Sequence, residues 1–281
     1  MTTRHVLTLT CPDRPGIVHG VCSALLDVDA NIVDNHQFGD ADSGTFCMRT
    51  VFDAAAPEAA VADVVGAALT GFGGHHTLRR LDDRPRVMVM VSKYDHCLVD
   101  LIYRWETGAL PVELSVVVSN HPDLGDLVRG HGIEFVHLPV TAATKATQEA
   151  AVLDLVRERS IDLVVLARYM QILSDDLCRH LEGRAINIHH SFLPGFKGAK
   201  PYHQAHERGV KLVGATAHFV TADLDEGPII EQDVARVTHA HRADELVRLG
   251  QDIERMVLSR AVRWWAEDRV LRVGDRTVVF G

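Results

Sequence analysis

The sequence predicts an α/β fold in two domains, and three observations support that prediction. Apolar stretches with strand character alternate with stretches of helical spacing along most of the chain. The order of these stretches changes after a polar, proline-containing segment at residues 82–86, where we place the domain boundary. A length of 281 residues accommodates one or two domains with a sizeable buried core.

The N-terminal part shows the element order βαββαβ. Strand patterns occur at residues 5–10, 31–38, 45–53 and 75–81, and helical spacing occurs at residues 17–27 and 57–69. Turn sequences rich in proline, aspartate and glycine occupy residues 11–16 and 40–44. Six elements in this order within about 80 residues are typical of a ferredoxin-like domain, predicted here over residues 1–83.

The remainder, residues 84–281, shows a different pattern. Apolar strands are expected at residues 87–91, 114–118, 163–167 and 185–188, with helices near 97–107, 145–159 and 174–181. Strands alternating with helices predict a mainly parallel, Rossmann-like sheet covered on both faces. Later strands at 211–220 and 228–237, expected to be antiparallel, precede a long helix at 241–267 and a hairpin at 270–280.

Composition excludes several classes of function. Lys and Arg total 29 against 38 for Asp and Glu, and the resulting net charge of −9 argues against a nucleic-acid partner. We find no run of 18 apolar residues and no signal-peptide pattern, so no membrane partner is expected. The five cysteines are scattered without a CxxC motif, which favours reduced thiols and a cytoplasmic location.

Two polar residues stand where an apolar strand ends. Asn187 and His189 are two residues apart and share one face of the strand, at its carboxyl end. Parallel sheets bind ligands at that edge. An amide there can stabilise an oxyanion, while an imidazole polarises the same carbonyl or moves a proton. The alternative is a pair of polar residues hydrogen-bonded to a neighbouring loop.

An acidic loop at residues 221–228 supplies candidate partners for His189. A carboxylate there would fix the protonation state of the imidazole and could activate a water molecule. On spacing alone Asp223, Asp225 and Glu226 are equally eligible, and a solvated acidic turn is the other interpretation.

Cofactor and metal sites find little support. The histidines at 203 and 206 have helical spacing, but no HExxH motif or fixed Cys/His spacing accompanies them. Neither GxGxxG nor a Walker A motif is present. We therefore expect no metal and no prosthetic group.

Several spaced motifs resemble the folate-dependent formyltransferase family from about residue 86 to the C-terminus. They are NIH at 187–189, SFLP at 191–194, FKG at 196–198, GATAHFV at 214–220 and LDEGPII at 224–230. The resemblance implies catalytic roles for Asn187, His189 and Asp225. It also places His218 near the site, although a structural strand histidine is an equal alternative. The folate-binding positions that it implies are Met170, Gln171, Ile172, Leu173, Asp223 and Gly227. Gln171 stands where the family commonly has Arg, which changes little if the pterin is held by backbone groups.

A hydrolytic branch of the family matches best. That branch has His at position 190, a possible catalytic helper, followed by the segment PYHQA at 201–205. It also carries an N-terminal ACT domain, which residues 5–81 resemble in element order and in the turn at 13–16. The resemblance implies hydrolysis of 10-formyltetrahydrofolate to tetrahydrofolate and formate, with formate supplied to purine synthesis and one-carbon pools kept in balance. It further implies glycine or methionine as effectors and a homo-oligomer, a dimer or a tetramer.

The loop after the first strand of the second domain favours hydrolysis over formyl transfer. Transfer to an amine such as glycinamide ribonucleotide needs a Gly/Ser-rich loop whose backbone N–H groups bind phosphate. Residues 92–97 read SKYDHC, with no glycine and one carboxylate. Two alternatives to hydrolysis remain. One is formyl transfer to an amine such as glycinamide ribonucleotide, and the other is a non-catalytic amino-acid or folate sensor.

Overall fold

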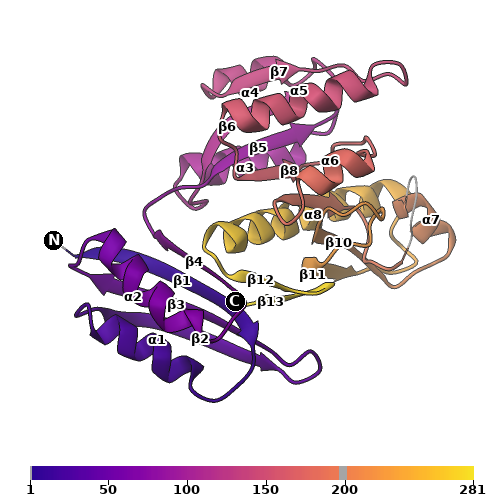
Figure 1. The fold of residues 1–281 in the computed structure, drawn as a ribbon. Coiled ribbons are helices and arrows are strands. Elements are labelled where there is room, and N and C mark those ends of the chain that lie inside the picture. The colour runs from indigo at the N-terminus through magenta and orange to yellow at the C-terminus, as the bar shows by residue number, and fades with distance from the viewer. Residues whose placement is uncertain (1, 196–200) are drawn as a thin grey trace. The chain divides into compact units, whose positions relative to one another are not determined.

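The computed structural model describes residues 2–195 and 201–281 and divides the chain into two compact units (Figure 1). The first unit takes in the chain up to residue 84 together with residues 267–281, and the second takes in residues 85–266. The motif residues Phe196, Lys197 and Gly198 lie outside the described part. No helix among the described residues is long and apolar enough to span a bilayer.

The first unit has the predicted βαββαβ order. Its elements are β1 (Thr3–Pro12), α1 (Ile17–Leu26), β2 (Asn31–Asp40), β3 (Thr45–Ala54), α2 (Glu58–Thr70) and β4 (His75–Arg80). The four strands form an antiparallel sheet in the order β2-β3-β1-β4. Apolar side chains of both helices pack with Leu7, Leu9 and Phe52 in one core. The predicted ferredoxin-like architecture is confirmed.

The C-terminal hairpin belongs to this first unit, whereas the sequence boundary had assigned it to the second domain. It comprises β12 (Val270–Val273) and β13 (Arg276–Val279), and its apolar side chains cluster with Cys47 of β3. Arg49 of β3 donates from Nε to the carbonyl of Glu267 over 3.0 Å. The physical reason is the almost continuous burial of β3, which requires cover on both faces of the sheet.

The second unit contains a seven-stranded sheet among the described residues, in the order β11-β10-β9-β8-β5-β6-β7. The strands are β5 (Arg86–Val91), β6 (Glu113–Ser119), β7 (Glu134–His137), β8 (Leu163–Leu166), β9 (Ala185–His189), β10 (Leu212–Phe219) and β11 (Ile229–Arg236). The helices are α3 (His96–Glu106), α4 (Gly125–Gly130), α5 (Lys145–Glu158), α6 (Asp175–His180), α7 (Pro201–Glu207) and α8 (Ala243–Ala266).

The mainly parallel sheet and the two antiparallel additions are confirmed. Strands β7, β6, β5, β8 and β9 run parallel, and β10 and β11 pair antiparallel at one edge. The sequence did not predict α4 and β7. Helix α4 has six residues and begins and ends with glycine, and β7 is a half-buried edge strand of four residues. Neither segment shows a recognisable apolar period.

The strand order creates a switch point between β5 and β8. The chain proceeds from β5 outward to β6 and β7, then returns to β8 and continues to β9 on the other side. At such a point the loops leaving neighbouring strands diverge and open a crevice at the carboxyl ends. The antiparallel strand β10 pairs with β9, so the loop that follows β10 adds to the same edge.

Candidate active site

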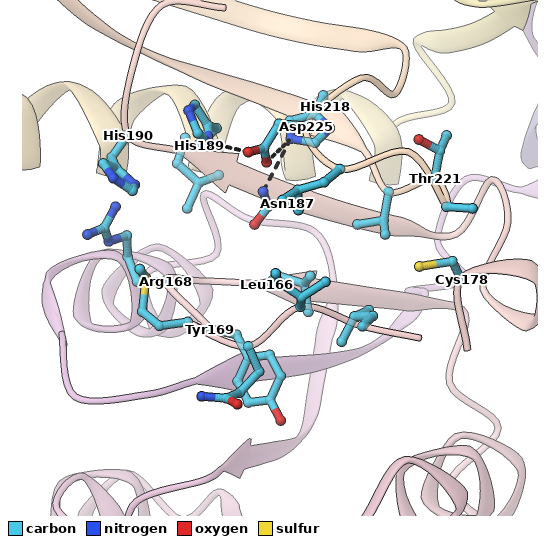
Figure 2. Close-up of a pocket in the computed structure, with 18 residues that line it drawn as sticks. Leu166, Arg168, Tyr169, Cys178, Asn187, His189, His190, His218, Thr221 and Asp225 are labelled. Carbon is cyan, nitrogen blue, oxygen red and sulfur yellow. Dashed lines mark hydrogen bonds and ion pairs between the residues drawn. The ribbon is translucent and has the colours of Figure 1, made fainter. Parts of the chain in front are cut away.

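A cavity of about 310 Å³ lies at the carboxyl ends of β8 and β9 (Figure 2). The predicted site residues that line it are Met170, Gln171, Ile172, Leu173, Asn187, His189, His190, His218 and Asp225. Asp223 and Gly227, which were expected to bind folate, are not among its lining residues. The cavity also has an unpredicted charged lining residue, Arg168.

Asn187 is held by its neighbour on the adjacent strand. In the register of β9 and β10, Asn187 lies directly opposite His218, and the two side chains meet with Nδ2 3.2 Å from Nε2. His218 Nδ1 lies 2.8 Å from the carbonyl of Phe219 and donates to it, which leaves Nε2 to accept from the amide. Burial lowers the pKa of His218 and keeps this ring neutral. One amide hydrogen of Asn187 therefore remains for a ligand.

His189 and Asp225 meet beside this amide. Nδ1 of His189 lies 3.3 Å from Oδ2 of Asp225, and the other carboxylate oxygen lies 3.8 Å from Nε2 of His218. Burial raises the pKa of Asp225, but the hydrogen bond from His189 and the electrostatic interaction with the neighbouring imidazoles together have the larger, opposite effect, so the pKa falls below its usual value. Nε2 of His189 is buried and has no hydrogen-bond partner among the described residues. This nitrogen is thus available to a substrate.

The loop after β10 places Asp225 by an unusual backbone conformation. Asp225 has a φ of 58°, in the left-handed region that Asp and Asn enter more readily than other non-glycine residues. Gly227 allows the chain to turn closely against β10, since an added Cβ would lie only 1.8 Å from the carbonyl oxygen of Phe219. Gly227 therefore has a backbone role here, and Asp223 is exposed.

His190 extends the polar wall of the cavity. Its ring stacks on that of His189, with 5.1 Å between centroids and 25° between planes. Burial, with the positive charges of Arg168 and His189, lowers the pKa of His190 to about 4. At neutral pH this imidazole is uncharged and can accept a hydrogen bond from water.

Comparisons with known proteins identify the families that the two parts of the chain match. Residues 85–262 match the family model described as formyl transferase, and residues 5–68 match the ACT domain model. The chain is 50% identical to the formyltetrahydrofolate deformylase of Corynebacterium sp. (strain P-1) over 279 residues, covering 98% of each chain. The Escherichia coli K12 protein of the same name is 39% identical, with 98% of each chain covered.

The chain belongs to the formyltetrahydrofolate deformylase family. A crystal structure of the Burkholderia mallei deformylase matches it with a TM-score of 0.96 and 49% identity, covering 99% of this chain and 100% of that one. The glycinamide ribonucleotide transformylase 1 of Symbiobacterium toebii matches with a TM-score of 0.67 and 31% identity. That match covers 70% of this chain and 95% of the other. The family that the motifs suggested is confirmed.

Two charged residues, one lining the cavity of this deformylase-family protein and one in contact with it, were not predicted from the sequence. Arg168 lies two residues after β8, at the carboxyl edge where such sheets bind ligands, and Glu254 of α8 lies 3.4 Å from its Nε. A cation just past a buried apolar strand is a signal that could have identified Arg168. Nothing local marks Glu254, because it is one of several acidic residues on a long amphipathic helix.

The pKa of His190 predicts a pH-dependent stability in this member of the deformylase family. The folded pKa of about 4 lies below the unfolded value of 6.5, so the unfolded chain binds more protons between these values and stability falls as pH decreases. Replacing His190 with Gln removes this titration. Between about pH 7.5 and about pH 5 the wild type should lose about 2 kcal/mol more than His190→Gln.

Unfolding free energies of both proteins at the two pH values provide the measurement. The titration of His218 has the same sign but is common to both proteins, so it cancels in the difference. Equal losses in the two proteins would show that His190 is not held uncharged in the folded state.

Proposed function

We propose that the chain hydrolyses 10-formyltetrahydrofolate to tetrahydrofolate and formate. The observation that carries this proposal is the group of Asn187, His189 and Asp225 around one cavity, with an amide hydrogen and an imidazole nitrogen left for a substrate carbonyl. Full-length likeness to proteins named formyltetrahydrofolate deformylase supports the substrate. Free formate would then be available to purine synthesis, and one-carbon pools would be balanced by its release.

The reaction uses the three side chains in distinct roles. Water adds to the formyl carbon while Asn187 Nδ2 and His189 Nε2 donate to the oxygen that gains negative charge. Asp225 accepts a hydrogen bond from Nδ1–H of His189, and as a carboxylate that lines the cavity it takes the proton of the attacking water. The bond from carbon to N10 then breaks, N10 receives that proton, and loss of the second proton leaves formate. His190 accepts a hydrogen bond from the water.

The loop after β5 supports water as the formyl acceptor. Ser92 donates to Oδ1 of Asn120 over 2.6 Å and accepts from the backbone N–H of Met170 over 3.0 Å. His96 Nε2 lies 2.8 Å from Oε2 of Glu254, and the ring of Tyr94 lies beneath the guanidinium of Arg168. These three side chains of the loop already contact other protein groups. The loop also has no glycine to bring backbone N–H groups close to a phosphate.

Formate release without an added acceptor tests the proposal. Purified protein is incubated with 10-formyltetrahydrofolate, and formate and tetrahydrofolate are both quantified. Equimolar products are expected, with no increase when glycinamide ribonucleotide is added. Formylated glycinamide ribonucleotide as the product would favour the transferase alternative, and folate binding without turnover would favour the sensor.

The chemistry is also proposed to need no metal. Among the described residues, one His/Cys/Glu group has metal-compatible spacing: His96, Cys97 and Glu254. The carboxylate of Glu254 is already bound by His96 and by the hydroxyl of Tyr202, and Arg168 brings a positive charge beside it. We expect treatment with EDTA followed by gel filtration to leave formate release unchanged. Loss of activity that a divalent ion restores would contradict this.

The ACT unit is proposed to bind an amino-acid effector, glycine or methionine, and to join subunits into a homo-oligomer. All of the proposed catalytic residues lie in the second unit.

A fragment of residues 85–266 should therefore retain folate affinity and lose any response to these amino acids, as measured by fluorescence titration. A fragment of residues 84–281 is the matched control, and it should be less soluble because Leu271, Val273 and Phe280 lose their partners. A full effector response in the shorter fragment would contradict the assignment of the effector site to the ACT unit.

A further inference from the structure

Arg168 is a buried cation that the proposed hydrolysis does not use. It lies just past the end of β8 with a φ of 64°, and only 9% of its surface is exposed. It lines the cavity that contains the catalytic group, and Figure 2 shows its guanidinium turned toward His190. A buried guanidinium is retained only where partners compensate for the lost hydration.

One side of the guanidinium is anchored. Glu254, 1% exposed, places Oε2 3.4 Å from Nε of Arg168. The hydroxyl of Tyr202 donates to the other carboxylate oxygen over 2.7 Å, and His96 Nε2 lies 2.8 Å from Oε2. Burial raises the pKa of Glu254, but the hydrogen bond from His96 and the charge of Arg168 have the larger, opposite effect. The net pKa lies below its usual value, so this carboxylate is ionised. The ring of Tyr94 lies 5.1 Å from the guanidinium carbon.

The remaining edge of the guanidinium lacks an acceptor. Nη1 is buried and makes no hydrogen bond with any described residue, whereas Nε is the atom that faces Glu254. The neighbouring His190 forms no hydrogen bond with Nη1 of Arg168. Guanidinium groups match carboxylates best, because two parallel N–H donors meet two oxygens. The unpaired Nη1 therefore indicates a carboxylate ligand that enters through the cavity, which Arg168 lines.

We propose that Arg168 forms a carboxylate subsite that receives formate as it leaves the catalytic group. This inference rests on the proposed hydrolysis, which generates one carboxylate at the formyl carbon. His190, stacked on His189 with centroids 5.1 Å apart, connects the reacting centre to Arg168, so a small planar anion has a short path. The glutamyl tail of the folate is the other source of a carboxylate.

Product inhibition by sodium formate tests the subsite, with sodium chloride at equal ionic strength as the salt control. In Arg168→Gln the inhibition constant for formate should rise at least about tenfold, because a charge-assisted hydrogen-bonded pair is lost. Arg168→Lys keeps the charge without the planar fork and should fall in between. Arg248→Gln, an exposed arginine of α8 paired with Asp244, is the matched control and should behave as the wild type. An unchanged inhibition constant in Arg168→Gln would overturn the proposal.

Two further measurements separate the remaining outcomes. The KM of each variant is compared for 10-formyltetrahydrofolate and for the amide of 10-formyltetrahydropteroate, which has neither the glutamate nor a free carboxylate. A rise confined to the glutamyl substrate, with formate inhibition unchanged, would assign Arg168 to the folate tail and overturn the formate subsite. If Arg168→Gln does not fold, the arginine Nε–H resonances of the wild type and of Arg168→Lys are titrated with sodium formate. The resonance that is missing in Arg168→Lys belongs to Arg168. A saturable shift of this resonance in the wild type supports the proposal, and the absence of a shift overturns it. Formate binding to a wild type that releases no formate would contradict the hydrolysis alone.

Discussion

Replacing Asp225 with Asn is expected to lower turnover by at least about 10²-fold, since general-base steps are typically worth about 10²–10⁴ in rate. Asn is the sharpest substitution because it keeps the shape of the side chain and, like Asp, tolerates the left-handed backbone at this position. It removes both the proton acceptor and the negative charge 3.3 Å from Nδ1 of His189. The measurement is single-turnover formate release, together with the Kd of a non-reactive folate, which should change little.

Asp223→Asn is the matched control for this substitution. Asp223 lies in the same loop, but its side chain is exposed and does not line the cavity. Its turnover should stay near that of the wild type. If Asp225→Asn kept more than about a tenth of the activity, less than about 1.4 kcal/mol of barrier would depend on it, and another group would have to act as the base.

Replacing Asn187 with Ala is expected to lower kcat by about 10²–10³-fold, the usual effect of removing one oxyanion donor. The amide is oriented by His218, so its free hydrogen is directed before the substrate arrives. The interaction strengthens only as charge develops on the formyl oxygen, and folate affinity should therefore be nearly unchanged. Steady-state kcat and KM, with the Kd of a non-reactive folate, give the measurement.

Asn31→Ala provides a control for general effects of removing an amide, because Asn31 is exposed at the start of β2 in the other unit. Its kinetics should match those of the wild type. A loss in Asn187→Ala that appears in KM alone would show uniform binding of the substrate instead of stabilisation of the transition state.

The sequence by itself determined the two sheets and the strand that carries Asn187 and His189. Alternation along a strand and spacing along a helix are local properties of the chain, and they predicted the βαββαβ order and the parallel sheet. The spaced motifs also selected Asp225 by resemblance, where spacing alone left Asp223, Asp225 and Glu226 open. The short elements α4 and β7 were missed because α4 begins and ends with glycine and β7 is only half-buried, without the continuous apolar run that marks β8.

The tertiary structure alone decided the contacts between distant segments. The register of β9 against β10 sets His218 opposite Asn187, and the backbone at Asp225 turns that carboxylate to His189 while Asp223 stays exposed. Packing of α8 brings Glu254 to Arg168, and packing of the C-terminal hairpin covers the second face of β3. Such pairings depend on the path of the whole chain, since residues far apart in sequence leave no local pattern that records which partner each will meet.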